Sequence, residues 1–450
     1  MSKLSQLILK YETSGPRYTS YPTAPHFSPA ESKQALIKKA LESGKAKSLY
    51  IHIPFCKTLC LFCGCSSSVC TEQKKADEYL ELLERELKIW QNLGFKRCAL
   101  EQIHFGGGTP NFLSPEQILR LGDIIKSFFE ISKTCEFSAE LDPRTLALEK
   151  VQAFAKIGIN RASIGVQDTN PEVQKAILRL QPNDLNKRAF EWLRSSGIKH
   201  INIDLMYGLP LQNSENFKRT IQDALELKPD RIALFNYAHV PWLKSAQKAL
   251  EKYPMARGEE KVALFEQAME AFENAGFEYI GLDHFAKPED ELIKARNEGS
   301  LQRNFQGYST RAGLDTFALG LTSISQTRDS YRQNVKVYKD YENSINAGSL
   351  PIERGIILRP DDLLRREIIM SIMCNLRLDF NKIESNYNLD FEKTFEKALQ
   401  NLSDFERDGL IELGENSLSV TKLGRLFLRN IAMNFDARMA GEKSKYSKTL

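Results

Sequence analysis

The sequence predicts an α/β protein: a partial (β/α)6-type barrel extended by further strands and followed by a mostly helical, winged-helix-like C-terminal domain. Three observations predict this fold. Short β-branched segments alternate six times with amphipathic helical segments. The β segments are spaced as in strands joined by crossover helices, which form a parallel sheet. Residues 395–431 read helix, strand, tight turn, strand, helix. An open doubly wound sheet is the alternative for the repeated part.

The individual elements follow from local patterns. The six strands are expected at 48–53, 99–105, 135–141, 161–167, 200–208 and 231–238, with further strand-like runs at 278–286 and 317–325. Apolar residues recur at helical spacing after the first strand, at Leu80, Leu83, Leu87 and Trp90. A helix is expected to begin at Ser114, an N-cap serine followed by proline, with Gln117 placed to close a capping box.

Three domains are predicted from these patterns. Residues 1–46 form a leader in which we find no helix or strand period, residues 47–355 form the barrel domain, and residues 356–450 form the C-terminal domain. Winged helices often bind DNA, but the chain has no concentrated basic recognition helix, so a structural or lid role is expected.

Composition excludes several classes of protein. The 450 residues are 42% hydrophobic and 27% charged, which is ordinary for a folded globular chain and excludes a disordered or coiled-coil protein. The net charge of +4 gives no reason to expect nucleic acid or an anionic membrane as a partner. No apolar run is long enough to span a bilayer and no secretion signal is evident, so a cytoplasmic location is expected.

Five of the eight cysteines lie between Cys56 and Cys70. Cys56, Cys60 and Cys63 follow the first predicted strand, and three closely spaced thiolates on a loop are typical of iron–sulfur ligands. Structural zinc is the rival, with Cys65 or Cys70 as a fourth ligand. The position at the carboxyl end of a barrel strand favours a reactive centre, because barrel enzymes place their chemistry there.

Further polar and glycine positions fall at the same edge of the predicted barrel. Residues 106–110 read Gly-Gly-Gly-Thr-Pro after the second strand; they allow close backbone approach to a ligand, or merely form an awkward turn. Later strands end in polar residues, which predicts a ring of donors and acceptors: Glu140, Gln167, Asp204 and Asn236. The histidines on or near strands are interpreted as structural: His52, His104, His239 and His284.

The cysteine spacing, with Phe62 before the third cysteine, resembles the radical S-adenosylmethionine superfamily when taken with the Gly-Gly-Gly-Thr-Pro motif. Within it, the chain resembles the oxygen-independent coproporphyrinogen III oxidases from about residue 10 to about residue 440, and no motif position that we can match is altered. The segments that carry this likeness include GPRYTSYPTA, YIHIPFCKTLCLFCGC, IHFGGGTP, AELDPR, NIDLMYGLP, RNFQGY and GRLFLRNIAMNFD.

The resemblance implies a reaction of haem biosynthesis. Two propionates of coproporphyrinogen III would be oxidatively decarboxylated to vinyl groups, giving protoporphyrinogen IX. A [4Fe-4S] cluster would reduce S-adenosylmethionine to methionine and a 5′-deoxyadenosyl radical, which removes a hydrogen atom that no side-chain base could remove as a proton. Each propionate then loses carbon dioxide and one electron, so an external electron donor and an acceptor are implied. A monomer is expected.

The resemblance also implies site residues. The cluster ligands would be Cys56, Cys60 and Cys63. The family binds two S-adenosylmethionine molecules; positions similar to contacts of the first are Tyr50, Gly107, Glu140 and Ile324. Positions similar to contacts of the second are Phe62, Gly108, Thr109, Gln167, Arg179, Asp204 and Ala238. The catalytic residue is unknown; Cys65, similar to a family cysteine that is not a cluster ligand, is the one candidate.

Two other functions compete with this interpretation. A radical S-adenosylmethionine haem chaperone would share the barrel and cluster, but typically lacks the leader and the extra Cys65. A zinc-containing winged-helix regulator would explain the cysteines and the C-terminal domain, but not residues 106–110 or the polar ring.

The leader is predicted to belong to the substrate site. Arg17, Tyr18 and Tyr21 lie beside Gly15-Pro16 and could offer a cation and aromatic faces along a surface. Arginine suits a carboxylate that must be held still, which makes Arg17 the candidate contact to a propionate. The alternative is an ordinary disordered start.

Overall fold

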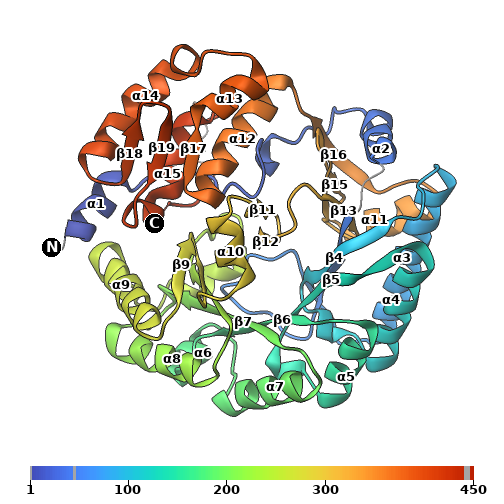
Figure 1. The fold of residues 1–450 in the computed structure, drawn as a ribbon. Coiled ribbons are helices and arrows are strands. Elements are labelled where there is room, and N and C mark those ends of the chain that lie inside the picture. Colours follow the sequence, from blue (N-terminus) through green and yellow to red (C-terminus); the bar gives the residue numbers. More distant parts are fainter. Residues whose placement is uncertain (1–2, 44–46, 440–445, 450) are drawn as a thin grey trace.

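The computed structural model of the chain describes residues 3–43, 47–439 and 446–449 (Figure 1). Its centre is a curved sheet in which six neighbouring strands run parallel, each hydrogen-bonded to the next. In order across the sheet these strands are β1 (Lys47–Ile53), β4 (Ala99–Gly107), β5 (Glu130–Leu141), β6 (Arg161–Gln167), β7 (His200–Tyr207) and β8 (Arg231–Asn236). All six predicted strands are therefore confirmed.

Further strands extend this parallel centre to twelve strands without closing it into a full barrel. On one side, β13 (Asp315–Leu319) pairs parallel with β1 and is followed by antiparallel β14 (Ile324–Gln326), β15 (Ser330–Asn334) and β16 (Ile352–Ile357). On the other side, β10 (His284–Ala286) pairs antiparallel with β8 and with β9 (Glu278–Gly281). The expected partial barrel with added strands is confirmed.

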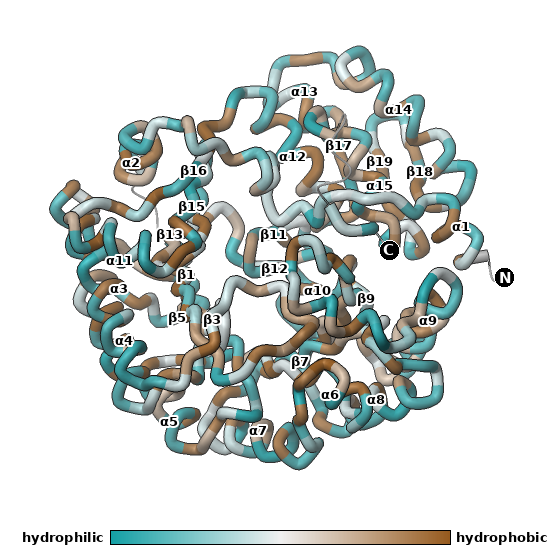
Figure 2. The backbone as a smooth tube through the Cα atoms, turned by 180° about the vertical axis from the view of Figure 1, so that it is seen from behind, coloured by the Kyte–Doolittle hydropathy of each residue, from teal (hydrophilic) through white to brown (hydrophobic). Residues whose placement is uncertain are grey.

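Amphipathic helices cover the outside of the sheet (Figure 1), and the tube in Figure 2 alternates between hydrophilic and hydrophobic along them. The four apolar residues predicted to share one helix face, Leu80 to Trp90, are all buried, and the capping box of Ser114 and Gln117 is formed. The barrel helices are α3 (Lys74–Asn92), α4 (Pro115–Phe128), α5 (Leu148–Ile157), α6 (Pro171–Ala176), α7 (Asn183–Ser195), α8 (Ser214–Glu226), α9 (Gly258–Asn274), α10 (Glu291–Asn297) and α11 (Tyr338–Asn346).

The C-terminal part lies between the two ends of the open sheet (Figure 1). It is mostly helical, with α12 (Pro360–Asn375), α13 (Phe380–Tyr387), α14 (Phe391–Arg407) and α15 (Leu428–Ala432) around a small sheet of β17 (Arg377–Asp379), β18 (Ile411–Gly414) and β19 (Ser417–Val420). The helix, strand, turn, strand order of the winged-helix prediction is present. No helix among the described residues is long and apolar enough to cross a bilayer.

The leader departs from its sequence prediction. It contains two helices, α1 (Lys3–Tyr11) and α2 (Lys33–Glu42), where we expected no helix. Leu7 and Ile8 of α1 are buried, and Tyr11 stacks on Phe405 of the C-terminal domain with ring centroids 4.4 Å apart. A helix this short is stabilised mainly by such tertiary packing, so its own sequence pattern is a weak signal.

The tyrosines of the leader are also placed differently from the prediction. Tyr18 and Tyr21 are each only 1% exposed, so they offer no aromatic faces to a surface. The Tyr18 hydroxyl donates to Asp436 at 2.9 Å, and the backbone N–H of Ala437 donates to the Tyr21 hydroxyl at 3.2 Å. The alternative of a disordered start is wrong for the described part of the leader, which is ordered by the C-terminal domain.

Arg429 joins the leader to the end of the chain. Its guanidinium is buried and donates to the carbonyl oxygens of Gly15 and Pro16 in the leader and of Ser447, Lys448 and Thr449 in the tail. The two segments also pair directly, because Gly15 N–H donates to Ser447 at 3.0 Å. One side chain from α15 therefore satisfies carbonyl groups of both chain ends.

Replacing Arg429 with methionine should destabilise the protein by about 2–5 kcal/mol, because several buried carbonyl groups lose a charged donor. We expect the Tm to fall and limited proteolysis to cut within residues 12–20. Arg407→Met, which removes an exposed pair with Asp404, is the control and should change stability by less than about 1 kcal/mol. Equal stability of the two variants would contradict the role given to Arg429.

Candidate active site

A pocket of about 170 Å³ opens at the carboxyl ends of the parallel strands. It brings together most of the side chains that sequence reasoning selected. From the cysteine loop come Cys56, Cys60, Phe62, Cys63 and Cys65; from the glycine motif Gly107, Gly108 and Thr109; and from later strands and loops Glu140, Gln167, Arg179 and Asp204. Residues from five separate parts of the chain meet here because parallel strands end at one edge.

The cysteine loop is held at its base by two very short strands, β2 (Phe55–Cys56) and β3 (Ser68–Val69). Cys70 N–H donates to the Cys56 carbonyl at 2.9 Å, which closes the loop beside the end of β1. Inside the loop, Cys63 N–H donates to the Cys60 carbonyl at 3.1 Å, and Leu61 N–H donates to Ile177 at 3.0 Å. The loop is therefore tied to the barrel, and four of its cysteines, Cys56, Cys60, Cys63 and Cys65, line one pocket.

The donor set of this loop fits an iron–sulfur cluster. All three motif thiols are free and line the pocket. Among the described residues, no three or more His, Cys, Asp or Glu side chains form a group that could hold a single metal ion. Hydrogen bonds from Cys65 lower the pKa of the Cys63 thiol, and Lys244 and Arg179 act in the same direction. Thiolates are the form that binds iron.

Two arginines approach the sulfur of Cys60. Arg144 Nη2 lies 3.3 Å from Cys60 Sγ, and Arg179 Nη1 lies 3.5 Å from it. Asp142 holds both, at 2.6 Å from Arg144 and 3.3 Å from Arg179. Burial opposes ionisation of Asp142, but these arginines keep its pKa below the usual value. Sequence reasoning missed Asp142 and Arg144; the Asp-Pro-Arg run directly after β5 is the signal that could have found them.

Glycine is required in this motif because its backbone lies very close to the residues at the end of β1 and just after it. Gly107 has φ +118°, and a Cβ there would lie 2.8 Å from the His52 ring and 2.9 Å from the Ile53 carbonyl. A Cβ on Gly108 would lie 2.8 Å from the Phe55 carbonyl. The end of β4 thus packs directly against the start of the cysteine loop, so the turn interpretation of these glycines holds while they also line the pocket.

Three of the four predicted polar strand ends line the pocket, namely Glu140, Gln167 and Asp204. His104 Nε2 and the Gly107 N–H lie 3.3 Å from the Glu140 carboxylate. Burial would raise the pKa of Glu140, but these two hydrogen bonds hold it below its usual value. Burial, and then the charge of Glu140, raise the pKa of Asp204 to about 7. One carboxylate is thus ionised while its neighbour titrates near neutrality.

Four predicted residues lie outside this pocket. Tyr50 is behind it, with its hydroxyl 3.0 Å from His52 Nδ1 and its ring stacked on His104. Ile324 packs on β14 against the cluster around Phe27. Asn236 and Ala238 line a second cavity instead. The expectation that all four polar strand ends surround one site is therefore wrong, because β8 ends beside a different opening.

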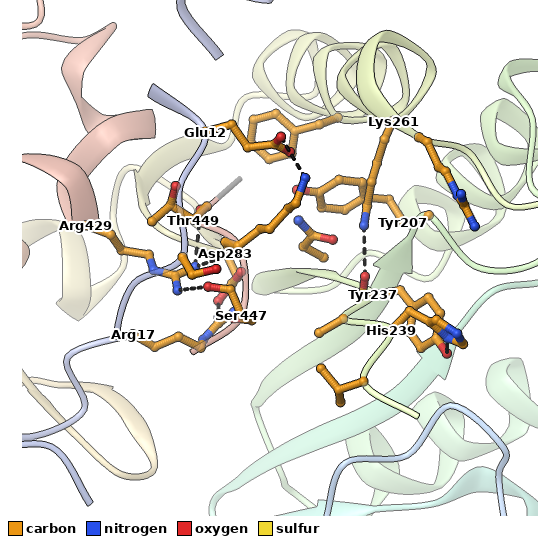
Figure 3. A pocket seen from close by; sticks show the side chains of 18 of the residues that line it. Glu12, Arg17, Tyr207, Tyr237, His239, Lys261, Asp283, Arg429, Ser447 and Thr449 are labelled. Atoms are coloured by element: carbon orange, nitrogen blue, oxygen red, sulfur yellow. Dashed lines mark hydrogen bonds and ion pairs between the residues drawn. The ribbon is translucent and has the colours of Figure 1, made fainter. Parts of the chain in front are cut away.

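The second cavity has a volume of about 520 Å³ and lies at the ends of β7 and β8, under α9 and the two chain termini (Figure 3). Arg17 of the leader lines it and forms an ion pair with Asp283. The cations that line the cavity outnumber its carboxylates, Glu12 and Asp283, and burial, then the charges of Arg429 and Arg303, lower the pKa of Arg17. An anionic ligand would relieve that excess.

Comparison with known proteins identifies the family. Residues 50–224 match the radical SAM superfamily model, and residues 358–427 match the HemN C-terminal domain model. The chain is 41% identical over 447 residues to the oxygen-independent coproporphyrinogen III oxidase of Helicobacter pylori, covering 98% of each chain, and 40% identical to that of Escherichia coli. The solved structure of the Escherichia coli enzyme superposes with a TM-score of 0.91 at 39% identity, covering 96% of this chain and 98% of that one.

The chain belongs to the oxygen-independent coproporphyrinogen III oxidases. Neither alternative function fits these matches, because the radical SAM model includes the cysteine loop and the oxidases align over almost the whole chain. Membership of the radical SAM superfamily implies a [4Fe-4S] cluster and S-adenosylmethionine. The pocket of this family member has the thiols, cations and carboxylates that suit both groups.

The raised pKa of Asp204 predicts a pH-dependent stability. The folded state binds a proton that the unfolded state releases near pH 3.8, so this contribution to stability is lost as the pH rises from about 4 to about 7. Asp204→Asn is neutral throughout. We expect the Tm of the Asp204→Asn apoprotein, relative to wild type, to increase over that range and to level off above it.

The control for this measurement is Asp123→Asn, at an exposed position on α4. Its Tm relative to wild type should stay constant over the same range. A constant difference for Asp204→Asn as well would show that Asp204 titrates normally in the folded protein.

Proposed function

We propose that this chain oxidatively decarboxylates two propionates of coproporphyrinogen III to vinyl groups without oxygen, giving protoporphyrinogen IX. The observation that carries this function is the presence of two sites bordered by one loop after β8: a thiol-lined pocket and a larger cavity in which cations outnumber carboxylates. When bound, the cluster and S-adenosylmethionine supply the 5′-deoxyadenosyl radical that removes a hydrogen atom. The substrate, with four propionates, suits the second cavity in charge.

The cysteine pocket has groups that complement S-adenosylmethionine. Cys56, Cys60 and Cys63 are proposed as cluster ligands, which leaves one iron open. Glu140 is ionised and 46% exposed, so it can accept hydrogen bonds from an ammonium or ribose hydroxyl. Arg179 already holds Asp142 and the Gly165 carbonyl, so it is rigidly placed to receive a carboxylate. Cys65 lines the same pocket and is the candidate for a catalytic side chain.

Two molecules of S-adenosylmethionine are proposed. The residues assigned to the second molecule run from the cysteine pocket, at Thr109 and Asp204, to Ala238 at the second cavity. A second molecule along that path would lie between the cluster and the tetrapyrrole. Tyr50 and Ile324, assigned to the first molecule, do not line the pocket and would act from behind it.

The leader is proposed to contribute to the substrate site through Arg17. Its side chain is 36% exposed and lines the second cavity, and its guanidinium keeps N–H donors beyond those turned toward Asp283. We also propose the domain limits 1–46, 47–355 and 356–450; residues 1–2, 44–46, 440–445 and 450 of these domains are outside the described part. The protein is proposed to be a monomer in the cytoplasm. It would use an external electron donor and an external electron acceptor.

The proposed function is tested by an anaerobic product assay on the reconstituted protein with S-adenosylmethionine, a reductant and coproporphyrinogen III. Cys56→Ala, Cys60→Ala and Cys63→Ala should each lose the cluster and the activity. Cys98→Ala, at a thiol outside both pockets, is the control and should keep about four iron atoms per chain. Loss of iron in Cys98→Ala and retention in Cys60→Ala would overturn the ligand assignment; an active cluster without decarboxylation would overturn the function.

Two further variants test whether one site binds S-adenosylmethionine and the other binds the substrate. Glu140→Gln should keep the cluster but weaken S-adenosylmethionine binding about 10- to 100-fold, since it loses a charge-assisted acceptor. Arg17→Leu should cleave S-adenosylmethionine normally in the absence of tetrapyrrole but lose propionate decarboxylation. Each variant is the control for the other. Loss of S-adenosylmethionine cleavage without tetrapyrrole in Arg17→Leu, or an unchanged S-adenosylmethionine affinity in Glu140→Gln, would contradict separate sites.

A further inference from the structure

The second cavity contains several cations, and most are already neutralised or engaged. Arg17 faces Asp283, Lys448 lies 2.7 Å from Glu12, and Arg429 is surrounded by carbonyl groups. Lys261 is different. Its ammonium donates to the Tyr237 carbonyl at 2.8 Å, and no carboxylate of the described residues forms an ion pair with it. Among the described lining residues, Arg429 and Arg257 also form no ion pair, but the donors of Arg429 are used by carbonyl groups and Arg257 is exposed.

The backbone is shaped to hold Lys261 in this position. Lys261 extends from α9 toward Tyr237 (Figure 3), and its side chain passes Gly208, directly after β7. Gly208 has φ +79°, and a Cβ there would lie 2.5 Å from Lys261 Cε. The ammonium is also 6.0 Å from the centre of the Tyr207 ring. Three N–H groups are available on an ammonium and one is used, so two remain for a ligand in the cavity.

Burial, and then the charge of Lys448, lower the pKa of Lys261 to about 8. The charge of Glu12 acts in the opposite direction without outweighing these two causes, so further negative charge beside the ammonium would be favourable. A carboxylate in the cavity would supply that charge.

The loop after β8 connects Lys261 to the cysteine pocket. Tyr237, whose carbonyl accepts the hydrogen bond from Lys261, directly follows β8. Farther along the loop, Gln247 is buried and donates to the Phe62 carbonyl at 3.0 Å and to the Ala238 carbonyl at 3.3 Å. Lys244 donates to the Cys65 carbonyl at 3.0 Å. One loop thus borders both the cation of the large cavity and the cysteine loop.

We propose that Lys261 is the carboxylate receptor of the second cavity and holds one propionate of the tetrapyrrole. The inference rests on the proposed function, which supplies the substrate. A propionate fixed on Lys261 orients the macrocycle, so that another propionate is presented toward the cysteine pocket. Arg17, whose charge is shared with Asp283, adds directional hydrogen bonds, whereas Lys261 supplies an ammonium with which no carboxylate among the described residues forms an ion pair.

The test is a fluorescence titration of the anaerobic holoenzyme with coproporphyrin III and with its tetramethyl ester, which has no carboxylates. Lys261→Met should weaken coproporphyrin III binding about 10- to 100-fold, the effect of losing one charge-assisted bond, and leave ester binding unchanged. Lys261→Arg should restore most of the affinity. Lys248→Met, at an exposed position on η4 (Ser245–Leu250), is the control and should bind as wild type.

Cleavage of S-adenosylmethionine without tetrapyrrole reports whether each variant is folded. If the Lys261→Met variant loses this cleavage, the Lys261→Gln variant is used in its place, with the same expected loss of affinity. Coproporphyrin III binding within about twofold of wild type, or an equal loss for the ester, would overturn the assignment. A wild-type holoenzyme that cleaves S-adenosylmethionine but does not decarboxylate coproporphyrinogen III would instead overturn the proposed function.

Discussion

The parallel alignment of six strands is the constraint on which the rest of the structure depends. Strands that run the same way end at the same edge, so the loops after β1, β4, β5, β6 and β7 meet at one mouth. The cysteine loop, the glycine motif and the carboxylates of Glu140 and Asp204 are far apart in sequence and adjacent in space for this reason alone. The glycines let two backbones touch at that edge, which leaves the thiols facing the carboxylates across a small pocket.

At this edge of the sheet, positively charged side chains outnumber the carboxylates that pair with them. Asp142 holds Arg144 and Arg179 against the sulfur of Cys60, so positive charge is kept where thiolates are expected. A buried carboxylate with two arginines is costly to dehydrate, and it persists because each group is hydrogen-bonded. In the second cavity the balance is different, since the only carboxylate facing Arg17 there is Asp283 and Lys261 has none among the described residues. The first pocket has cations beside its thiols, and in the second the cations outnumber the carboxylates.

The open ends of the sheet are covered by the two ends of the chain. Ser28 of the leader pairs with Gly355 at the outer edge of β16, and Arg425 donates to Tyr279 on the outer strand β9. Covering an edge in this way prevents pairing with another chain. Because the barrel does not close, the leader and the tail also form a wall of the large cavity, tied together by Arg429. The open architecture therefore depends on the ordered leader and tail to wall this cavity.

The sequence by itself determined the features that depend on local patterns. The six strands, the capping box at Ser114, the winged-helix order and the spacing of Cys56, Cys60 and Cys63 all follow from short-range periodicity or spacing, and the family likeness rests on such motifs. The tertiary structure decided what depends on pairing across the chain: that Tyr18 and Tyr21 are buried, that Asn236 borders the second cavity, that Asp142 joins two arginines, and that no carboxylate of the described residues forms an ion pair with Lys261. The physical reason is that a residue's charge and chemistry are local, whereas its burial and its partners are set by segments that can be hundreds of positions away, as for Arg17 and Asp283.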